Sequence, residues 1–378
     1  MAQIKPPFET FARIKVVGIG GAGCNALARM IEARIHGVEF IAVNTDAQAL
    51  HNSSAATKIH IGKSLTRGLG AGMNPDIGRQ AADDTKEEIM NALKGSDMVF
   101  ITAGMGGGTG SGASSVVADI AKDVGALTVA VVTKPFSFEG PQRSRIAEDA
   151  WNVLRDKVDA LITIPNDRLL SVIDRKTPLL ESFGIVDDVL RQGVQGISDL
   201  ITIPGIINVD FADVKTIMAN SGSALMGIGK SSGEDRAVEA AKMAINSPLL
   251  EVSIDGARGV LFNVSGGTDM AMAEINEAAR IITEHIDPDA KVIFGAVLDD
   301  KLKKGEIKIT VVATGFNNGY PNSTTPSANG RQNILESMSP KKPSLQMSST
   351  PTVKELVDSS INDEEFDIPA FIRRKMNK

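Results

Sequence analysis

The sequence predicts an α/β fold with a parallel sheet, a long central helix, a smaller α+β domain and a disordered C-terminal tail. Three observations support this prediction. Short apolar runs alternate with helical patterns over residues 13–165, one amphipathic pattern covers residues 178–202, and a second alternation covers residues 222–316. Beyond residue 316 the periodicity ends, and Asn, Ser, Thr and Pro become frequent.

The first alternation predicts a parallel sheet covered by helices on both faces. Its strands are apolar on both sides, which is typical of strands buried between two helical layers. We expect strands at residues 14–19, 39–43, 98–103, 127–133 and 160–164. We expect helices at residues 26–35, 76–94, 113–121 and 141–158. These elements make up a first domain, assigned to residues 11–177.

The central helix is predicted from apolar residues that recur every three or four positions between residues 178 and 202. At a rise of ~1.5 Å per residue it is about 35 Å long. Gly184, Gly193 and Gly196 interrupt it, and each costs about 1 kcal/mol relative to alanine in a helix interior. We therefore expect these glycines where neighbouring elements pack closely. A loop and a further helix follow at residues 203–221.

The second alternation predicts a small α+β domain over residues 222–316. Its expected strands are residues 223–229, 259–264, 291–298 and 306–314, and its expected helices are 234–245 and 269–285. Residues 317–365 are predicted to be a disordered linker. Residues 366–378 contain apolar side chains with no core to join, so this segment is predicted to dock on a partner.

Composition excludes several classes of protein. The 378 residues carry a net charge of −6, which argues against a general nucleic-acid binder, and the aromatic content of 4% leaves few side chains for base stacking. Cys24 is the one cysteine, so no intramolecular disulfide can form. We find no signal peptide and no apolar run near the ~20 residues of a membrane helix, and expect a cytoplasmic protein.

A glycine-rich loop at residues 104–112 (GMGGGTGSG) joins a predicted strand to a predicted helix. Glycines reach positive φ at low cost, so successive N–H groups of such a loop can converge on an anion. The start of the next helix adds further N–H groups and the positive end of its dipole. Thr109 and Ser111 add hydroxyl donors. The natural ligand of this loop is a phosphate group.

A second glycine motif lies at residues 18–23 (GIGGAG) and satisfies the dinucleotide pattern G-x-G-x-x-G. Asp46 even follows the next strand, near the position of a ribose-binding acid. On this motif alone a dinucleotide site and another phosphate site are equally supported. The presence of two glycine loops favours a polyphosphate held from both sides. Residues 62–64 and 229–231 (both GKS) lack the earlier glycine of a Walker loop.

The predicted loops converge because parallel sheets bind ligands at the carboxyl ends of their strands. The polar segments that follow the five strands are residues 20–25, 44–46, 104–112 and 133–143, with Asn166 after the last strand. We expect them along one rim of the sheet.

Four motifs together resemble the tubulin/FtsZ family and occur in that family's order. They are residues 20–26 (GGAGCNA), 106–112 (GGGTGSG), 135–140 (PFSFEG) and 208–214 (NVDFADV). The resemblance extends over residues 11–316, and residues 367–372 (DIPAFI) are similar to the family's C-terminal peptide. It implies a tubulin-like fold, GTP or GDP as ligand, and hydrolysis of GTP to GDP and phosphate.

The resemblance implies a role for each part of the rim. The glycine loops would hold the phosphates, and Mg²⁺ would bind through those phosphates without fixed protein ligands. Asp187 would accept hydrogen bonds from the adjacent N1–H and N2 amino groups of guanine, which adenine lacks. The residues implied to bind GTP are Gly20, Gly21, Ala22, Gly23, Cys24, Asn25, Asn44, Gly104, Gly106, Gly107, Gly108, Thr109, Gly110, Thr133, Glu139, Arg143, Asn166, Phe183 and Asp187.

The resemblance also implies that Asn208, Asp210 and Asp213 are catalytic. They follow the central helix and would lie about 35 Å from the nucleotide of their own chain. Head-to-tail stacking would bring them to the nucleotide of the next subunit, and such a contact generates a filament. Family resemblance places these filaments in the cytokinetic ring at midcell in bacterial cell division.

The resemblance implies two kinds of partner. One is a second copy of the chain, in the homopolymer. The others are membrane-tethering and regulatory division proteins, which would bind the terminal peptide through Asp367, Ile368, Pro369, Phe371, Ile372 and Arg373.

Two other hypotheses about the function are an NAD-dependent enzyme, and a tubulin-like scaffold that binds nucleotide without turnover.

Overall fold

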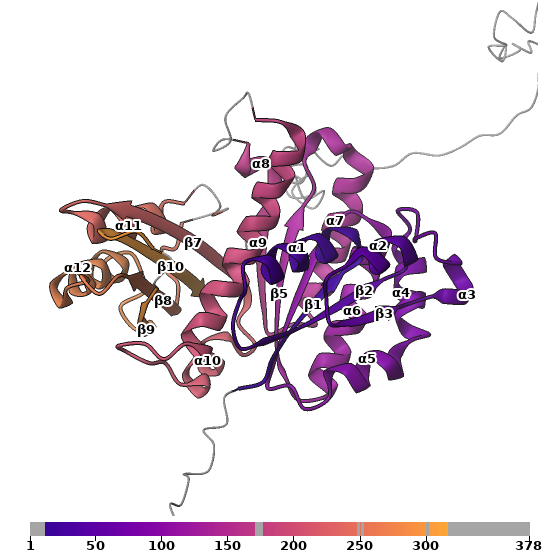
Figure 1. Ribbon diagram of the computed structural model, residues 1–378, viewed down its shortest axis with the longest axis horizontal. Helices are drawn as coiled ribbons and strands as arrows, with labels where there is room; N and C mark the ends of the chain where they lie inside the picture. The colour runs from indigo at the N-terminus through magenta and orange to yellow at the C-terminus, as the bar shows by residue number, and fades with distance from the viewer. Residues whose placement is uncertain (1–11, 171–176, 248–249, 251–252, 300–301, 317–378) are drawn as a thin grey trace, which may run out of the picture. The chain divides into compact units, whose positions relative to one another are not determined.

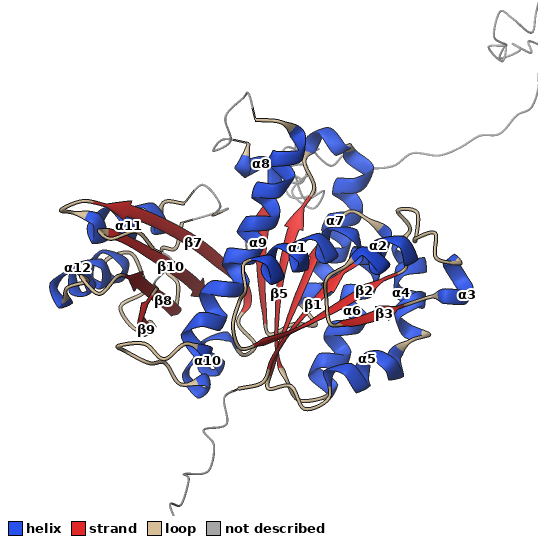
Figure 2. Cartoon of the chain, in the orientation of Figure 1, coloured by secondary structure: helices blue, strands red, loops and turns tan. Residues whose placement is uncertain are grey.

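The computed structural model describes residues 12–316, except residues 171–176, 248–249, 251–252 and 300–301 (Figure 1). The predicted linker (317–365) and the predicted docking peptide (366–378) lie outside the described residues, together with the six partner-binding residues assigned to that peptide. The fold is mixed α/β, and most of its strand pairs are parallel, as the sequence predicts (Figure 2). Among the described residues, no helix has the length and hydropathy needed to cross a membrane.

The N-terminal strands form a parallel sheet in the order β3-β2-β1-β4-β5-β6. Five of them match predicted strands: β1 (Ile14–Ile19), β2 (Val38–Asn44), β4 (Met98–Gly104), β5 (Leu127–Lys134) and β6 (Ala160–Pro165). Strand β3 (Thr57–His60) was not predicted, because it has only four residues and two of them are exposed. All six strands point the same way, so the loops after them meet at one edge.

Helices cover both faces of this sheet. Helix α1 (Gly20–Glu32) packs on the same face as α9 (Leu179–Thr202), and α4 (Pro75–Asp83), α5 (Lys86–Leu93) and α7 (Pro141–Arg155) pack around α6 (Gly108–Asp123). Short elements complete the loops: α2 (Ala47–Asn52), α3 (Lys63–Thr66), α8 (Asn166–Leu169) and the 3₁₀ turn η1 (Ser137–Glu139).

The expected single helix at 76–94 is wrong, since α4 ends at Asp83 and α5 begins at Lys86. The side chain of Thr85 between them donates to the carbonyl of Ala81, which is a local alternative to helix continuation. Two predicted helix starts also differ: α1 begins at Gly20 and α6 at Gly108, so the glycine loops themselves form the first helical turns.

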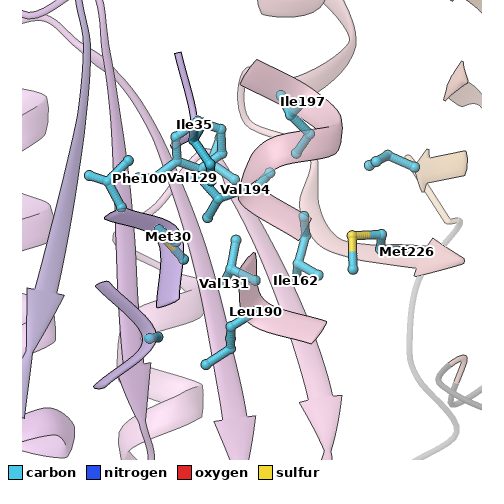
Figure 3. Packing of buried hydrophobic residues seen from close by; sticks show 14 of the residues in the cluster. Met30, Ile35, Phe100, Val129, Val131, Ile162, Leu190, Val194, Ile197 and Met226 are labelled. Atoms are coloured by element: carbon cyan, nitrogen blue, oxygen red, sulfur yellow. The ribbon is translucent and has the colours of Figure 1, made fainter. Parts of the chain in front are cut away.

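The central helix α9 packs one side against the sheet through Leu190, Val194 and Ile197 (Figure 3). The expectation that its glycines mark close packing is confirmed for Gly193 and Gly196, whereas Gly184 meets only the end of the Arg29 side chain. A Cβ on Gly196 would lie 2.7 Å from the Cγ2 of Thr310, and one on Gly193 would lie 3.1 Å from the Cε of Met226. On the same helix, Leu190, Val194 and Ile197 are at most 1% exposed. The α9 helix thus joins the two halves of the described chain into one core.

The described residues after α9 form four strands and three helices. They are α10 (Phe211–Met218), β7 (Gly222–Ser232), α11 (Arg236–Ile245), β8 (Gly259–Gly266), α12 (Met272–Thr283), β9 (Lys291–Leu298) and β10 (Glu306–Thr314). Strand β7 pairs in parallel with β6 at its start and antiparallel with β10 along its length. The strands therefore form one continuous ten-stranded sheet, where the sequence suggested two separate units.

The two G-K-S segments set aside as Walker loops have other roles. Gly229 lies inside β7, where a Cβ would come within 1.9 Å of the carbonyl oxygen of Ala240 in α11. The next residue, Lys230, pairs with Glu306 of the neighbouring strand at 2.9 Å. Gly62 precedes the single-turn helix α3.

Candidate nucleotide-binding site

A cavity of about 440 Å³ lies at the carboxyl ends of the strands, where the sequence places the predicted rim. Five segments line it: the β1–α1 turn, the β4–α6 loop, the segment from β5 to α7, the start of α8, and the first half of α9. The sequence-predicted residues that it brings together are Gly20, Gly21, Ala22, Asn25, Gly104, Gly107, Gly108, Thr109, Gly110, Thr133, Glu139, Arg143, Asn166, Phe183 and Asp187. Met105 and Pro135 also line it and belong to the predicted rim segments, although neither was named as a ligand. Ile19, Val186 and Leu190 line it as well and were not predicted.

Four of the residues implied to bind GTP do not line the cavity, and their contacts hold the neighbouring backbone in place. Gly23 is held so close to β4 that a Cβ would stand 2.5 Å from the carbonyl oxygen of Thr102. Cys24 is buried, and burial raises the pKa of its thiol to about 11, which leaves it protonated and inert. The buried Asn44 accepts a hydrogen bond from the N–H of Asp46. Gly106 has φ of 97° and allows the sharp turn before α6.

The two glycine loops are in direct contact and act as one cradle. Gly20 has φ of 71°, and a Cβ on it would lie 3.0 Å from the backbone nitrogen of Gly110. A Cβ on Gly104 would lie 2.7 Å from the Cβ of Ala22. This close approach explains why Gly20 and Gly104 carry no side chain at the contact between the loops.

The cradle presents unpaired backbone N–H groups. The first N–H groups of any helix have no intrahelical partner, and at α1 and α6 no N-cap side chain satisfies them. The positive ends of both helix dipoles point toward the same cavity. Ser111, expected as a second hydroxyl donor, is not on the lining: its Oγ accepts a hydrogen bond from the N–H of Gly106 at 2.9 Å. Thr109 is on the lining.

A charged pair closes one side of the cavity. Arg143, on the first turn of α7, donates to a carboxylate oxygen of Glu139. The other carboxylate oxygen of Glu139 accepts from the N–H of Phe136 at 3.0 Å. Glu139 is therefore fixed at both oxygens, and the remaining N–H groups of the guanidinium are available to an anionic ligand.

The far side of the cavity suits a purine base. Asn166 is 5% exposed, and its Oδ1 has no hydrogen-bond partner among the described residues, so it is an acceptor in need of a donor. On α9, burial raises the pKa of Asp187 to about 6, partly opposed by the charge of Arg29. Phe183 lies one turn before Asp187 and keeps 38% of its surface exposed.

The aromatic side chains that hold Phe183 in place were not predicted from the sequence. The ring of Phe136, only 1% exposed, meets Phe183 edge to face at a centroid distance of 5.6 Å. Phe138 also stacks on Phe136, at a centroid distance of 4.9 Å. The sequence does contain two phenylalanines separated by one serine within residues 135–140. Their contact with α9, however, depends on the fold.

The structure does not bring the three predicted catalytic residues to the cavity of their own chain. All three residues are exposed, and they lie around the start of α10. Helix α10 follows the other end of α9 (Figure 1). The 24 residues of α9 correspond to about 36 Å at ~1.5 Å per residue. The Oδ1 of Asn208 accepts from the N–H of Gly205 at 2.7 Å, which holds the loop before α10 in shape.

In the structure Asp46 does not take the ribose-binding position that the dinucleotide interpretation requires. The Oδ1 of Asp46 accepts from the N–H groups of Gln48 and Ala49 at 2.9 and 3.0 Å and caps α2. Asp46 is not on the cavity lining. Its carboxylate is engaged by the helix cap that follows β2.

Two family models match the chain. The family model described as "Tubulin/FtsZ family, GTPase domain" matches residues 13–174, and the model of the FtsZ family C-terminal domain matches residues 222–317. Fold and site together define a GTPase of the tubulin-like class, with a guanine-nucleotide-binding domain.

Solved structures extend the comparison over most of the chain. Two structures of FtsZ from M. jannaschii, an empty dimer and a point mutant, each share 49% identity with a TM-score of 0.78; they cover 81% of this chain and 89% and 92% of their own. CetZ2 from Haloferax volcanii, described as a GTPγS-bound protofilament, has 19% identity and a TM-score of 0.70 over 86% of this chain and 100% of its own, which shows a shared fold. The chain belongs to the tubulin/FtsZ family, and its C-terminal domain is of the FtsZ type.

Proposed function

We propose that this protein is a GTPase that polymerises head to tail and completes its active site at each contact between subunits. One observation carries the proposal: the nucleotide cavity and the exposed acids Asp210 and Asp213 lie at opposite ends of α9. A subunit with these two half-sites needs a neighbour for hydrolysis. Because the contact joins two different surfaces, it repeats without closing and yields a filament.

In the proposed complex the glycine cradle binds the phosphates through its free N–H groups, and Arg143 adds a positive charge. Thr133 and Glu139 face the ribose. Asn25, Asn166 and the ionised Asp187 hydrogen-bond the base, and Phe183 stacks on it.

The proposed hydrolysis uses residues of two subunits. Asp210 and Asp213 of one subunit orient a water molecule toward the terminal phosphate held by the next, and Asn208 shapes their loop. Phosphoryl transfer depends mainly on such positioning and on charge stabilisation. Mg²⁺ fits this site through the phosphate oxygens and water, its usual mode with nucleotides, because Glu139 is already paired with Arg143. When bound there it offsets the charge of the phosphates.

The cellular part of the proposal follows from family membership. The filaments would form the cytokinetic ring at midcell in the bacterial cytoplasm, and hydrolysis would weaken subunit contacts and allow turnover. The terminal peptide, Asp367 to Arg373, would bind membrane-tethering and regulatory division proteins. The M. jannaschii dimer and the CetZ2 protofilament are relatives whose structures contain self-association, which supports a homopolymer here.

A mixing experiment tests the shared active site. Asp213→Ala retains an intact nucleotide cavity, and Asp187→Ala retains intact acids, so each variant alone should lose at least ~100-fold in GTP turnover. In an equal mixture, about half of the subunits carry an intact cavity and about half carry intact acids. About a quarter of the head-to-tail contacts then join the intact cavity of Asp213→Ala to the intact acids of Asp187→Ala. We expect phosphate release from the mixture to exceed the sum of the two separate rates.

Asp83→Ala is the matched control, because Asp83 is an exposed acid on α4 outside both half-sites. It should behave as wild type. The wild-type rate per subunit should also rise steeply above a threshold concentration. If dilute, unassociated protein hydrolysed GTP at the full rate per subunit, and mixing restored nothing, the proposal would be wrong.

A further inference from the structure

A pair of threonine hydroxyls links the end of β2 to the phosphate cradle. Thr45 immediately follows β2 and is fully buried. Its Oγ1 lies 2.6 Å from the Oγ1 of Thr109, which is a hydrogen bond between two hydroxyls. Thr109 belongs to the first turn of α6 and lines the nucleotide cavity, while Thr45 does not.

The direction of this hydrogen bond follows from the partners on each side. In the described part of the chain, the Thr45 hydroxyl bonds to no group other than the Thr109 hydroxyl. A buried hydroxyl without a partner costs free energy, and each hydroxyl has a single hydrogen to donate. If Thr109 donated to Thr45, the hydrogen of Thr45 would lack an acceptor and the lone pairs of Thr109 would face the cavity. If Thr45 donates, its hydrogen is satisfied, and the hydrogen of Thr109 is free to point at a ligand oxygen.

The backbone of Thr45 is held in place independently. Its carbonyl oxygen lies 3.3 Å from the Oγ1 of Thr66 and 3.3 Å from the Nε2 of His60. The N–H of Ala47, two residues on, donates to the carbonyl of Gly68 at 3.1 Å. The backbone of Thr45 is thus held by β3 and α3, and the segment after α3 holds Ala47. The hydroxyl of Thr45 is therefore fixed in a position from which it can orient Thr109.

We propose that Thr45 is a positioning residue for phosphate binding: its hydroxyl donates to Thr109 Oγ1 and thereby turns the Thr109 hydroxyl into a donor aimed at a phosphate oxygen of the bound nucleotide. A chain of two hydroxyls also polarises the terminal donor, which strengthens its bond to an anion. Thr45 itself touches no ligand. This inference rests on the proposed nucleotide site and adds a residue to it.

Thr45→Val tests the inference, because it removes the hydroxyl and retains a branched side chain. The measurement is the dissociation constant of GDP and of guanosine for each variant, obtained by competition against one fluorescent nucleotide. We expect Thr45→Val to weaken GDP binding about 5-fold, the effect of one hydrogen bond, and to leave guanosine binding unchanged. A merely structural role would weaken both ligands alike.

Further variants sharpen the test. Thr45→Ser keeps the hydroxyl and should restore most of the GDP affinity. Thr45→Val combined with Thr109→Val should bind GDP no more weakly than Thr109→Val alone, because the first hydroxyl acts through the second. Thr128→Val is the matched control: Thr128 is equally buried, but its hydroxyl bonds to the carbonyl of Ala126, at the start of β5 and away from the cavity.

The outcomes separate this inference from the proposed function. Normal GDP binding by Thr45→Val, an equal loss for guanosine, or additive losses in the double variant would each overturn the role of Thr45 and leave the nucleotide site standing. Wild-type protein that binds neither GDP nor guanosine would overturn both.

Discussion

Gly20 of the first glycine loop lies against Gly110 of the second, so closely that a Cβ on Gly20 would stand 3.0 Å from the Gly110 nitrogen. The contact joins residues 90 positions apart and turns two short motifs into one phosphate cradle. Gly20 also has φ of 71°, a backbone conformation that residues other than glycine rarely adopt.

Gly20→Ala should therefore disrupt the cradle. The strained φ costs about 1–2 kcal/mol, and the new methyl group pushes the two loops apart. We expect a lower melting temperature and a loss of at least ~10-fold in GDP affinity. Gly21→Ala is the stability control, because a Cβ there meets nothing within 4 Å and its φ is not positive. Equal melting temperatures for the two variants would contradict the close contact.

Nucleotide affinity should depend on the ionisation of Asp187. Burial raises the pKa of this carboxyl to about 6 in the free protein, so it is largely protonated below that pH. The N–H groups of guanine need the ionised form as acceptor. Binding to the ionised form lowers the pKa of Asp187 in the complex, so the GDP association constant should fall about 10-fold for each pH unit below 6. Above pH 6 the carboxyl is already ionised, and the constant should level off.

Asp187→Asn separates this effect from titration of the phosphate, which also occurs near pH 6. The variant should bind GDP more weakly at pH 7.5 and lose the part of the pH dependence that Asp187 causes. Isothermal titration between pH 5 and 8 measures both quantities. Identical pH profiles for wild type and variant would remove the carboxylate from base recognition.

The glycines of α9 should respond differently to alanine. At Gly196 the new Cβ meets the Cγ2 of Thr310 at 2.7 Å, on a strand of the sheet, so Gly196→Ala should destabilise the protein by about 1–3 kcal/mol. At Gly184 it meets only the flexible end of Arg29 at 3.1 Å. Gly184→Ala should therefore be neutral or stabilise by up to ~1 kcal/mol, through helix propensity. Denaturant unfolding of both variants checks the order, and a more stable Gly196→Ala would refute the packing.

An ion cluster around the buried Arg236 in the C-terminal half should make stability depend on acid pH. Arg236, with 7% of its side chain exposed, bonds to Asp269 at 2.7 Å and to Glu274 at 2.6 Å. Hydrogen bonding to the guanidinium lowers the pKa of Glu274 and of Asp269. Because these pKa values are depressed by folding, the cluster stabilises the protein above the ordinary carboxyl range and loses this effect as the pH falls through the depressed values.

Arg236→Met should consequently lower the melting temperature at pH 7, since it leaves two carboxylates without their partner. The difference from wild type should shrink as the pH falls below about 4, where free carboxyls become protonated. Thermal unfolding from pH 7 to pH 3 measures it. A difference that is constant over this range would mean that Arg236 contributes packing alone.

Several local features could be predicted from the sequence because they depend on neighbouring residues. Five parallel strands, the long helix and both glycine loops follow from apolar periodicity and from the backbone freedom of glycine. The short strand β3 and the small helices α2 and α3 carry too few residues for a periodic signal. The break between α4 and α5 depends on a hydrogen bond of Thr85 that competes with the helix, and periodicity does not record it.

The sequence by itself determined the chemistry of this protein: which residues offer free N–H groups to a phosphate, which carboxylates exist, and in what order they occur. Only the tertiary structure decided which of them share a cavity, because that depends on contacts between distant segments. Such contacts place Thr45 beside Thr109, set Phe136 against Phe183, and join both sheets through β7. Burial, likewise a property of the folded chain, sets the pKa of Asp187.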